Sequence, residues 1–103
     1  MLRNNVLSLN LTYYWYELIK SGKKTTEYRR YCDYWNKRFK NNQYDIVVLH
    51  RGYSKENIAF KINTIKLLKN QPNDLNESIC WAIELGEKIE NFRIGNTINC
   101  SNK

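Results

Sequence analysis

The segment from Gly22 to Arg29 restricts the possible folds more than any other part of this chain. The residues before Gly22 have the spacing of a short amphipathic helix, and a glycine with positive φ is a common way to end one. Directly after this glycine the side chains follow the period of two that is typical of a β-strand, with Thr25, Glu27 and Arg29 on one face. A helix that passes into a strand through one glycine indicates a mixed α+β fold.

Charged side chains lie two residues apart on that strand face. Glu27 and Arg29 have opposite charges, and Lys24 stands where the predicted strand begins. Burying charged groups costs free energy unless each is paired with a partner. The three residues therefore form either a structural ion-pair network or the floor of a binding site. The sequence leaves both interpretations open, and we favour the binding site.

The rest of the chain consists of short strands with few helices between them. We predict strands over 6–11, 24–30, 44–50, 58–68, 79–85 and 92–98, and helices over 13–21 and 34–40, with Thr12 and Asp33 as their N-caps. This pattern is typical of a small mixed β-barrel of roughly five to six strands with one or two short helices. We therefore predict an α+β fold, with a single domain over 1–98 and a mobile tail over 99–103.

The chain is strongly basic. It has 17 Lys and Arg residues against 10 Asp and Glu residues in a length of 103, which gives a net charge of +7. Such a charge attracts polyanions: nucleic acid first, acidic protein surfaces second and anionic membranes third. The alternative is that the excess charge serves only solubility.

The cysteines and the apolar segments limit the cellular setting and the cofactors. Cys32, Cys80 and Cys100 show no C-x-x-C spacing, which argues against a secreted disulfide scaffold and against a zinc site. No apolar stretch is long enough to cross a membrane, and the first residues lack a signal peptide. We therefore expect a cytoplasmic protein, in a bacterium or in the host cell of a phage, with no metal, no cofactor and no membrane partner.

Three motifs in this order resemble the ASCH domain family. They are G-x-K-x-x-E-x-R at 22–29, Y-W-x-K-R at 34–38 and G-Y-x-K at 52–55. With shorter matches at 7–9, 44–47 and 83–86, the resemblance covers nearly the whole chain and is closest to a bacterial and phage subfamily. It implies a PUA-like β-barrel whose ends are closed by helices, with a cleft beside the first helix that holds RNA or a modified base.

Carried over to this sequence, the resemblance places Lys24, Glu27 and Arg29 in the cleft. Cations hold phosphate or carbonyl oxygens, a carboxylate accepts from an amine or a ribose hydroxyl, and aromatic rings stack on bases. Arg51 stands where many relatives have Arg or Lys before the Gly-Tyr pair, although the Asn that often precedes this glycine is absent. The candidate binding residues are Lys23, Lys24, Thr25, Glu27, Arg29, Tyr34, Lys37, Arg38, Arg51, Tyr53 and Lys55. The predicted function is binding of RNA or a nucleotide, with single-stranded nucleic acid as the expected partner.

Two alternatives stay open. Some ASCH relatives are small amidohydrolases that act on acylated cytidine through a Lys, a Thr and a Glu, and others are reported as ribonucleases. In a hydrolase Lys24 and Glu27 would be catalytic, although Glu27 takes the threonine's position and Thr25 lies two residues earlier. Cleavage of RNA through its own 2′-hydroxyl would use Glu27 or His50 as the base. The second alternative is an interaction protein of a phage or mobile element that inhibits a host nucleic-acid-handling factor.

Overall fold

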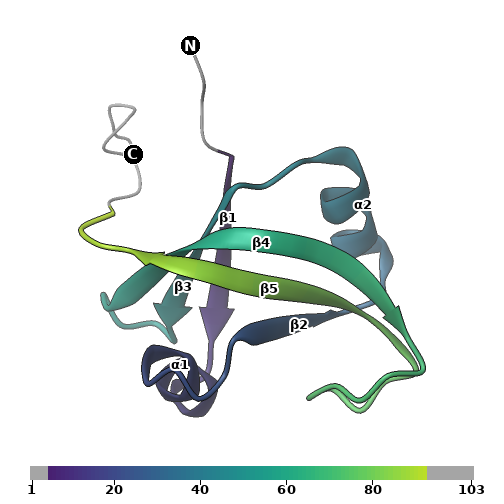
Figure 1. Cartoon of the computed structure of the whole chain (residues 1–103), viewed down its shortest axis with the longest axis horizontal. Coiled ribbons are helices and arrows are strands. Elements are labelled where there is room, and N and C mark those ends of the chain that lie inside the picture. Colours follow the sequence, from purple (N-terminus) through teal and green to yellow (C-terminus); the bar gives the residue numbers. More distant parts are fainter. Residues whose placement is uncertain (1–4, 93–103) are drawn as a thin grey trace.

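The molecule is built on one curled β-sheet. A computed structural model of the chain describes residues 5–92, and in this part five strands form a single sheet in the order β1-β3-β4-β5-β2 (Figure 1). β1 pairs in parallel with β3, and the other neighbours pair antiparallel. The elements are β1 (Val6–Leu11), α1 (Tyr13–Lys20), β2 (Thr26–Arg30), α2 (Asp33–Asn41), β3 (Ile46–Arg51), β4 (Asn57–Lys69) and β5 (Ile79–Ile89). The curl brings the edge strands β1 and β2 towards each other, so the sheet forms an open half-barrel.

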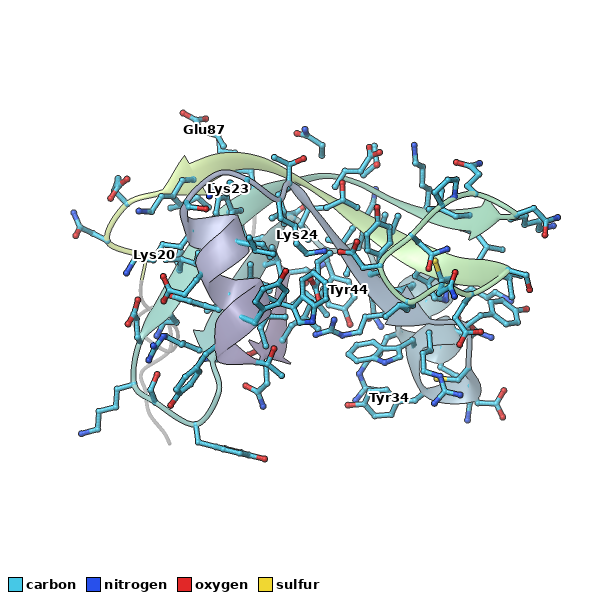
Figure 2. The ribbon with its side chains drawn as sticks, turned by 90° about the horizontal axis from the view of Figure 1, so that it is seen from below. Lys20, Lys23, Lys24, Tyr34, Tyr44 and Glu87 are labelled. Carbon is cyan, nitrogen blue, oxygen red and sulfur yellow. The ribbon has the colours of Figure 1, made fainter. Side chains whose placement is uncertain are left out.

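The concave side of the half-barrel holds the main hydrophobic core. Both helices lie on the same side of the β4–β5 hairpin (Figure 2). α2 packs its half-buried Trp35 and Phe39 against this core. The buried core side chains are Leu7, Leu9, Leu11, Tyr16, Ile19, Val47, Leu49 and Ile83. The predicted α+β class, a small mixed barrel with two short helices, is confirmed.

Two glycines adopt left-handed backbone conformations that shape the region around α1. At Gly22 φ is 85° and the N–H donates to the carbonyl of Ile19 at 3.0 Å, which confirms that this glycine follows the end of the helix. At Gly52, in the turn after β3, φ is 56° and a Cβ would lie 2.8 Å from the ring of Tyr13. The missing side chain therefore lets this turn pack directly on α1.

The starts of β2 and α2 differ from the predicted ones. β2 begins at Thr26 and not at residue 24, because the N–H of Lys24 still donates to the carbonyl of Leu18 in α1, at 3.1 Å. Cys32 is the N-cap of α2, so Asp33 lies in the first turn of the helix and is not its cap. A carboxylate in the first turn still interacts favourably with the positive end of the helix dipole.

β5 and β4 are longer than the predicted strands over 79–85 and 58–68. β5 continues to Ile89 because β4 pairs with it as far as Ala59, with register shifts on both sides of Ile62. The predicted strand over 92–98 lies outside the described residues except for Phe92, which follows the end of β5. The predicted tail over 99–103 also lies outside them. Within residues 5–92, neither helix has the length and apolar character needed to span a membrane.

Candidate ligand-binding site

A cavity of about 530 Å³ lies where the two edges of the curled sheet face each other. Its walls come from β1 and β2, from both helices and from the loop between β4 and β5. The side chains that matter for its chemistry are Trp15, Lys24, Glu27, Arg29, Tyr34 and Trp35. The volume is within the range of pockets that hold small molecules, which is roughly 300–1,000 Å³.

Arg29 connects the two sheet edges across this opening. The carbonyls of Asn5 and Leu11 bond to β3 and to the turn after it. Successive residues of a strand direct their backbone groups to opposite sides, so the carbonyl of Asn10 faces away from β3. The guanidinium of Arg29 donates to this carbonyl at 3.2 Å and to the carbonyl of Tyr28 on β2 at 2.9 Å. One side chain thus ties together two strands that do not pair with each other.

Glu27 is a buried carboxylate with cationic partners. It is 6% exposed and lies opposite Ile83 of the core in the β2–β5 register. Arg29 makes a direct ion pair with it, and the Nζ atom of Lys24 lies 3.6 Å from its Oε1 atom. Lys24 also makes a direct ion pair with Asp74. The cluster therefore contains two cations and two carboxylates, and its formal charges balance.

Aromatic rings surround the cations of this cluster. The Nζ atom of Lys24 lies 5.0 Å from the ring centroid of Trp15 and 4.8 Å from that of Tyr28. The guanidinium carbon of Arg29 lies 5.6 Å from the ring of Trp35. The cavity thus combines fixed charges with flat apolar walls, which is the combination that recognises flat polar ligands.

Asp74 reaches the cavity from the loop between β4 and β5. The side-chain amide of Asn73 donates to the carbonyl of Glu77 at 2.8 Å and holds the loop in a turn. Leu75, like Tyr28, packs against the buried cluster of Leu68, Cys80 and Ala82. The ion pair joins Asp74 to Lys24, which is 50 residues away in the sequence. No local pattern around Asp74 identifies it as a site residue, because its partner is supplied by tertiary structure.

The predicted site residues divide into groups. The cavity brings together Lys24, Glu27, Arg29 and Tyr34. Lys23 and Thr25 border a neighbouring, more open hollow that shares Lys24. Lys37 and Arg38 lie on α2, and the guanidinium of Arg38 lies over the ring of Tyr34. Figure 2 shows Lys24 beside α1 and Tyr34 beside α2.

The other predicted binding residues lie away from the cavity, in and around the turn after β3. Arg51 is paired with Glu17 of α1 at 3.1 Å, and its guanidinium carbon lies 3.9 Å from the ring of Tyr13. Tyr53 and Lys55 are exposed. The structure therefore does not bring these three residues to Lys24 and Glu27.

The candidate binding residues named from the sequence do not include Trp15, Trp35 and Asp74, which all border the cavity. Trp15 packs on the core from α1 while one side of it borders the cavity. Trp35 has the same dual position on α2. In the structure Trp15 stands between exposed Tyr14 and buried Tyr16, at the edge of the helix's apolar face, and the sequence alone did not show this position.

His50 makes the stability dependent on pH. Burial lowers its pKa below the ordinary value of 6.5, and its Nε2 atom lies 2.7 Å from the Oγ atom of Ser8. The unfolded chain therefore binds a proton more readily than the folded chain. We expect the contribution of His50 to the free energy of unfolding to be constant above about pH 7.5 and to fall as the pH drops through the unfolded pKa.

This prediction is checked by urea unfolding at about pH 7.5 and about pH 5.5, comparing the natural chain with His50→Gln. The variant should lose less stability between the two pH values. Glu56 and Glu84 have pKa values below their ordinary 4.5, so their contribution is lost only at lower pH. An equal loss in both proteins would contradict the role of His50.

A scan of the chain against models of known protein families finds no match, and a search of curated proteins finds no similar sequence. The fold and the site by themselves define a small α+β protein with a ligand-sized, charge-balanced cavity at the opening of a half-barrel.

Proposed function

We propose that this protein is an ASCH-like binding protein for RNA or nucleotides, and that its cavity holds one base. The motifs that resemble the ASCH family support this proposal through their positions. The first motif supplies Lys24, Glu27 and Arg29 to the cavity, and the second supplies Tyr34 and Trp35. The third motif forms the turn that packs on α1.

The observation that carries the proposal is the charge balance of the cavity together with its aromatic walls. Lys24 and Arg29 already have carboxylate partners, so a phosphate would have to compete with Glu27 and Asp74 for them. An uncharged ligand with donors and acceptors on its edge avoids that competition. A nucleobase is such a ligand, and its flat face gains about 1–3 kcal/mol from stacking on an aromatic ring.

The opening of the half-barrel supplies further groups for the edge of a base. Ser8 and Asn10 border the cavity, and the alternation of β1 turns their backbone groups away from β3. These groups include donors and acceptors at fixed positions, of which the Asn10 carbonyl already accepts from Arg29. Glu27 adds a carboxylate that accepts from an exocyclic amine, and it is aligned by Arg29.

The amidohydrolase alternative requires a nucleophile beside Lys24 and Glu27. Thr25, the residue considered for that role, is exposed and borders the neighbouring hollow and not the cavity. The placement of these side chains therefore favours binding over amide hydrolysis.

The test is a titration with the common ribonucleosides and their 5′-monophosphates, followed by tryptophan fluorescence, since Trp15 and Trp35 border the cavity. We expect at least one nucleoside to bind and to be recovered unchanged. Glu27→Gln should weaken this binding about fivefold, the value of one hydrogen bond of about 1 kcal/mol.

The matched control is Glu87→Gln, which makes the same change on the opposite side of the β4–β5 hairpin from the helices (Figure 2). This control should bind as the natural chain does. Circular dichroism of each variant verifies that it is folded. The proposal is wrong if no nucleoside or nucleotide binds, or if both variants lose affinity equally.

A further inference from the structure

The exposed side of α2 carries cations that have no carboxylate partner. We call Tyr34, Lys37 and Arg38 the α2 surface. Within residues 5–92, no carboxylate oxygen lies within 4.0 Å of the Lys37 or Arg38 nitrogens. The paired cations in the same part of the chain are Lys20, Lys24, Arg29, Arg51, Lys61, Lys66 and Lys88. The α2 surface is thus a place where positive charge is left free for a partner.

Arg38 is held in position by an aromatic ring. Its guanidinium carbon lies 3.7 Å from the ring centroid of Tyr34, and its Nη1 atom donates to the carbonyl of the same tyrosine at 3.4 Å. A guanidinium stacked on one aromatic ring has its second face available for a base and its edge available for a phosphate. Tyr34 itself is 56% exposed. The pair is therefore a preorganised stacking platform with a charge on it.

The α2 surface is continuous with the cavity. Tyr34 and its neighbour Trp35 both border the cavity, and their rings meet edge to face at 4.8 Å between centroids. A ligand that fills the cavity and extends past Tyr34 therefore reaches Arg38 and Lys37. The Nζ atom of Lys40 lies 5.9 Å from the ring of Tyr31, a second cation and tyrosine pair at this helix.

We propose that the α2 surface binds the phosphate groups and one neighbouring base of a single-stranded nucleic acid whose next base lies in the cavity. This inference rests on the proposed function and names its substrate class: a strand, and not a free nucleoside. The cavity is charge-balanced and selects the base, whereas the α2 cations attract the backbone. A single strand is required because its bases are free to turn outward and stack on side chains.

The experiment compares a nucleoside with a tetranucleotide RNA of the same base, at several salt concentrations from about 50 mM to 200 mM. The natural chain should bind the tetranucleotide at least about tenfold more tightly than the nucleoside. The logarithm of the tetranucleotide affinity should fall linearly with the logarithm of the salt concentration, and the nucleoside should lack this salt slope. In the double variant Lys37→Gln/Arg38→Gln, the slope for the tetranucleotide should fall by about 1.4, which is about 0.7 for each lost phosphate contact. This variant should lose at least about tenfold more affinity for the tetranucleotide than for the nucleoside.

The matched control is Lys61→Gln/Lys88→Gln, which removes the same charge from exposed lysines that are paired with Glu87 and Glu90. It should keep both the affinity and the salt slope. If the control loses as much as the α2 variant, the effect is one of net charge and the inference is overturned. The inference is also overturned if the nucleoside binds and the tetranucleotide binds no more tightly.

Two further probes separate possible partners of the α2 surface. Single-stranded DNA of the same sequence should show the same loss in the α2 variant, since the phosphates are shared by both polymers. A polyglutamate peptide should bind at least tenfold more weakly than the tetranucleotide, because it has no base to stack. Equal binding of the peptide would overturn the inference in favour of an acidic protein partner. If neither nucleoside nor tetranucleotide binds, the proposed function fails and this inference fails with it.

Discussion

Replacing Arg29 by methionine is expected to lower the free energy of unfolding by about 2–3 kcal/mol. Removing one partner of a buried ion pair costs roughly 3–5 kcal/mol, because the other charge stays buried without compensation. The loss is smaller here because the Arg29 side chain is 17% exposed and Lys24 remains 3.6 Å from Glu27. The substitution also removes the donors to the carbonyls of Asn10 and Tyr28. Urea unfolding monitored by circular dichroism measures the change.

The chain contains its own control for this prediction. Arg51 pairs with Glu17, a carboxylate whose side chain is 52% exposed. Arg51→Met makes the same chemical change at the surface, and exposed ion pairs contribute only about 0–1 kcal/mol. The double variant Arg29→Met/Glu27→Leu should recover at least half of the loss, because it removes the uncompensated carboxylate. Equal costs for Arg29→Met and Arg51→Met would show that the cavity cluster is solvated like an ordinary surface.

Replacing Asp74 by asparagine is expected to make a nucleoside 5′-monophosphate bind about ten- to a hundredfold more tightly. The carboxylate of Asp74 is ion-paired with the ammonium group of Lys24, whose side chain is 10% exposed. A phosphate must therefore displace this carboxylate to reach Lys24. A hydrogen bond to a charged group contributes about 1.5–3 kcal/mol, which corresponds to this range of affinity. The uncharged nucleoside should bind within about twofold of the natural chain, since it does not compete for Lys24. Calorimetric titration measures both affinities.

Glu87→Gln is again the control, because it raises the net charge equally and lies on the opposite side of the β4–β5 hairpin (Figure 2). At about 150 mM salt, charges beyond roughly 8 Å are screened, so this variant should change the affinity less than twofold. A similar gain for the nucleoside and the monophosphate in Asp74→Asn would mean that the loop restricts entry to the cavity sterically. In that case Asp74 would not be a competing anion.

Local sequence signals predicted most of the fold. The end of α1 at Gly22 and the face shared by Glu27 and Arg29 follow from positive φ and from strand periodicity, which act over a few residues. The length of β5 did not follow, because the mostly apolar run that predicts the strand ends at Leu85 and polar residues follow Gly86. The pairing with β4 nevertheless carries the strand on to Ile89. Strand ends depend on the partner strand, which local sequence does not specify.

The residues of the candidate site also divide into those that the local sequence predicted and those that it did not. The motif around Gly22 placed Lys24, Glu27 and Arg29 together, and the structure brings them to one cavity. It did not reveal Asp74, whose loop is brought to Lys24 by the β4–β5 hairpin. The sequence also grouped Arg51 and its neighbours with the site residues. In the structure they lie around the turn after β3, where Arg51 contacts α1 and not the cavity.

The sequence by itself determined that a helix ends just before Gly22, that an acid and a base share one strand face, and that the chain is basic. These are properties of neighbouring residues and of composition. Only the tertiary structure decided that the cluster is charge-balanced, because the second carboxylate comes from a distant loop. It also decided that the cations of α2 stay unpaired within residues 5–92 while those of the cavity do not. Whether a charge is free or paired depends on which groups the fold brings within a few ångströms, and separation along the chain does not reveal that.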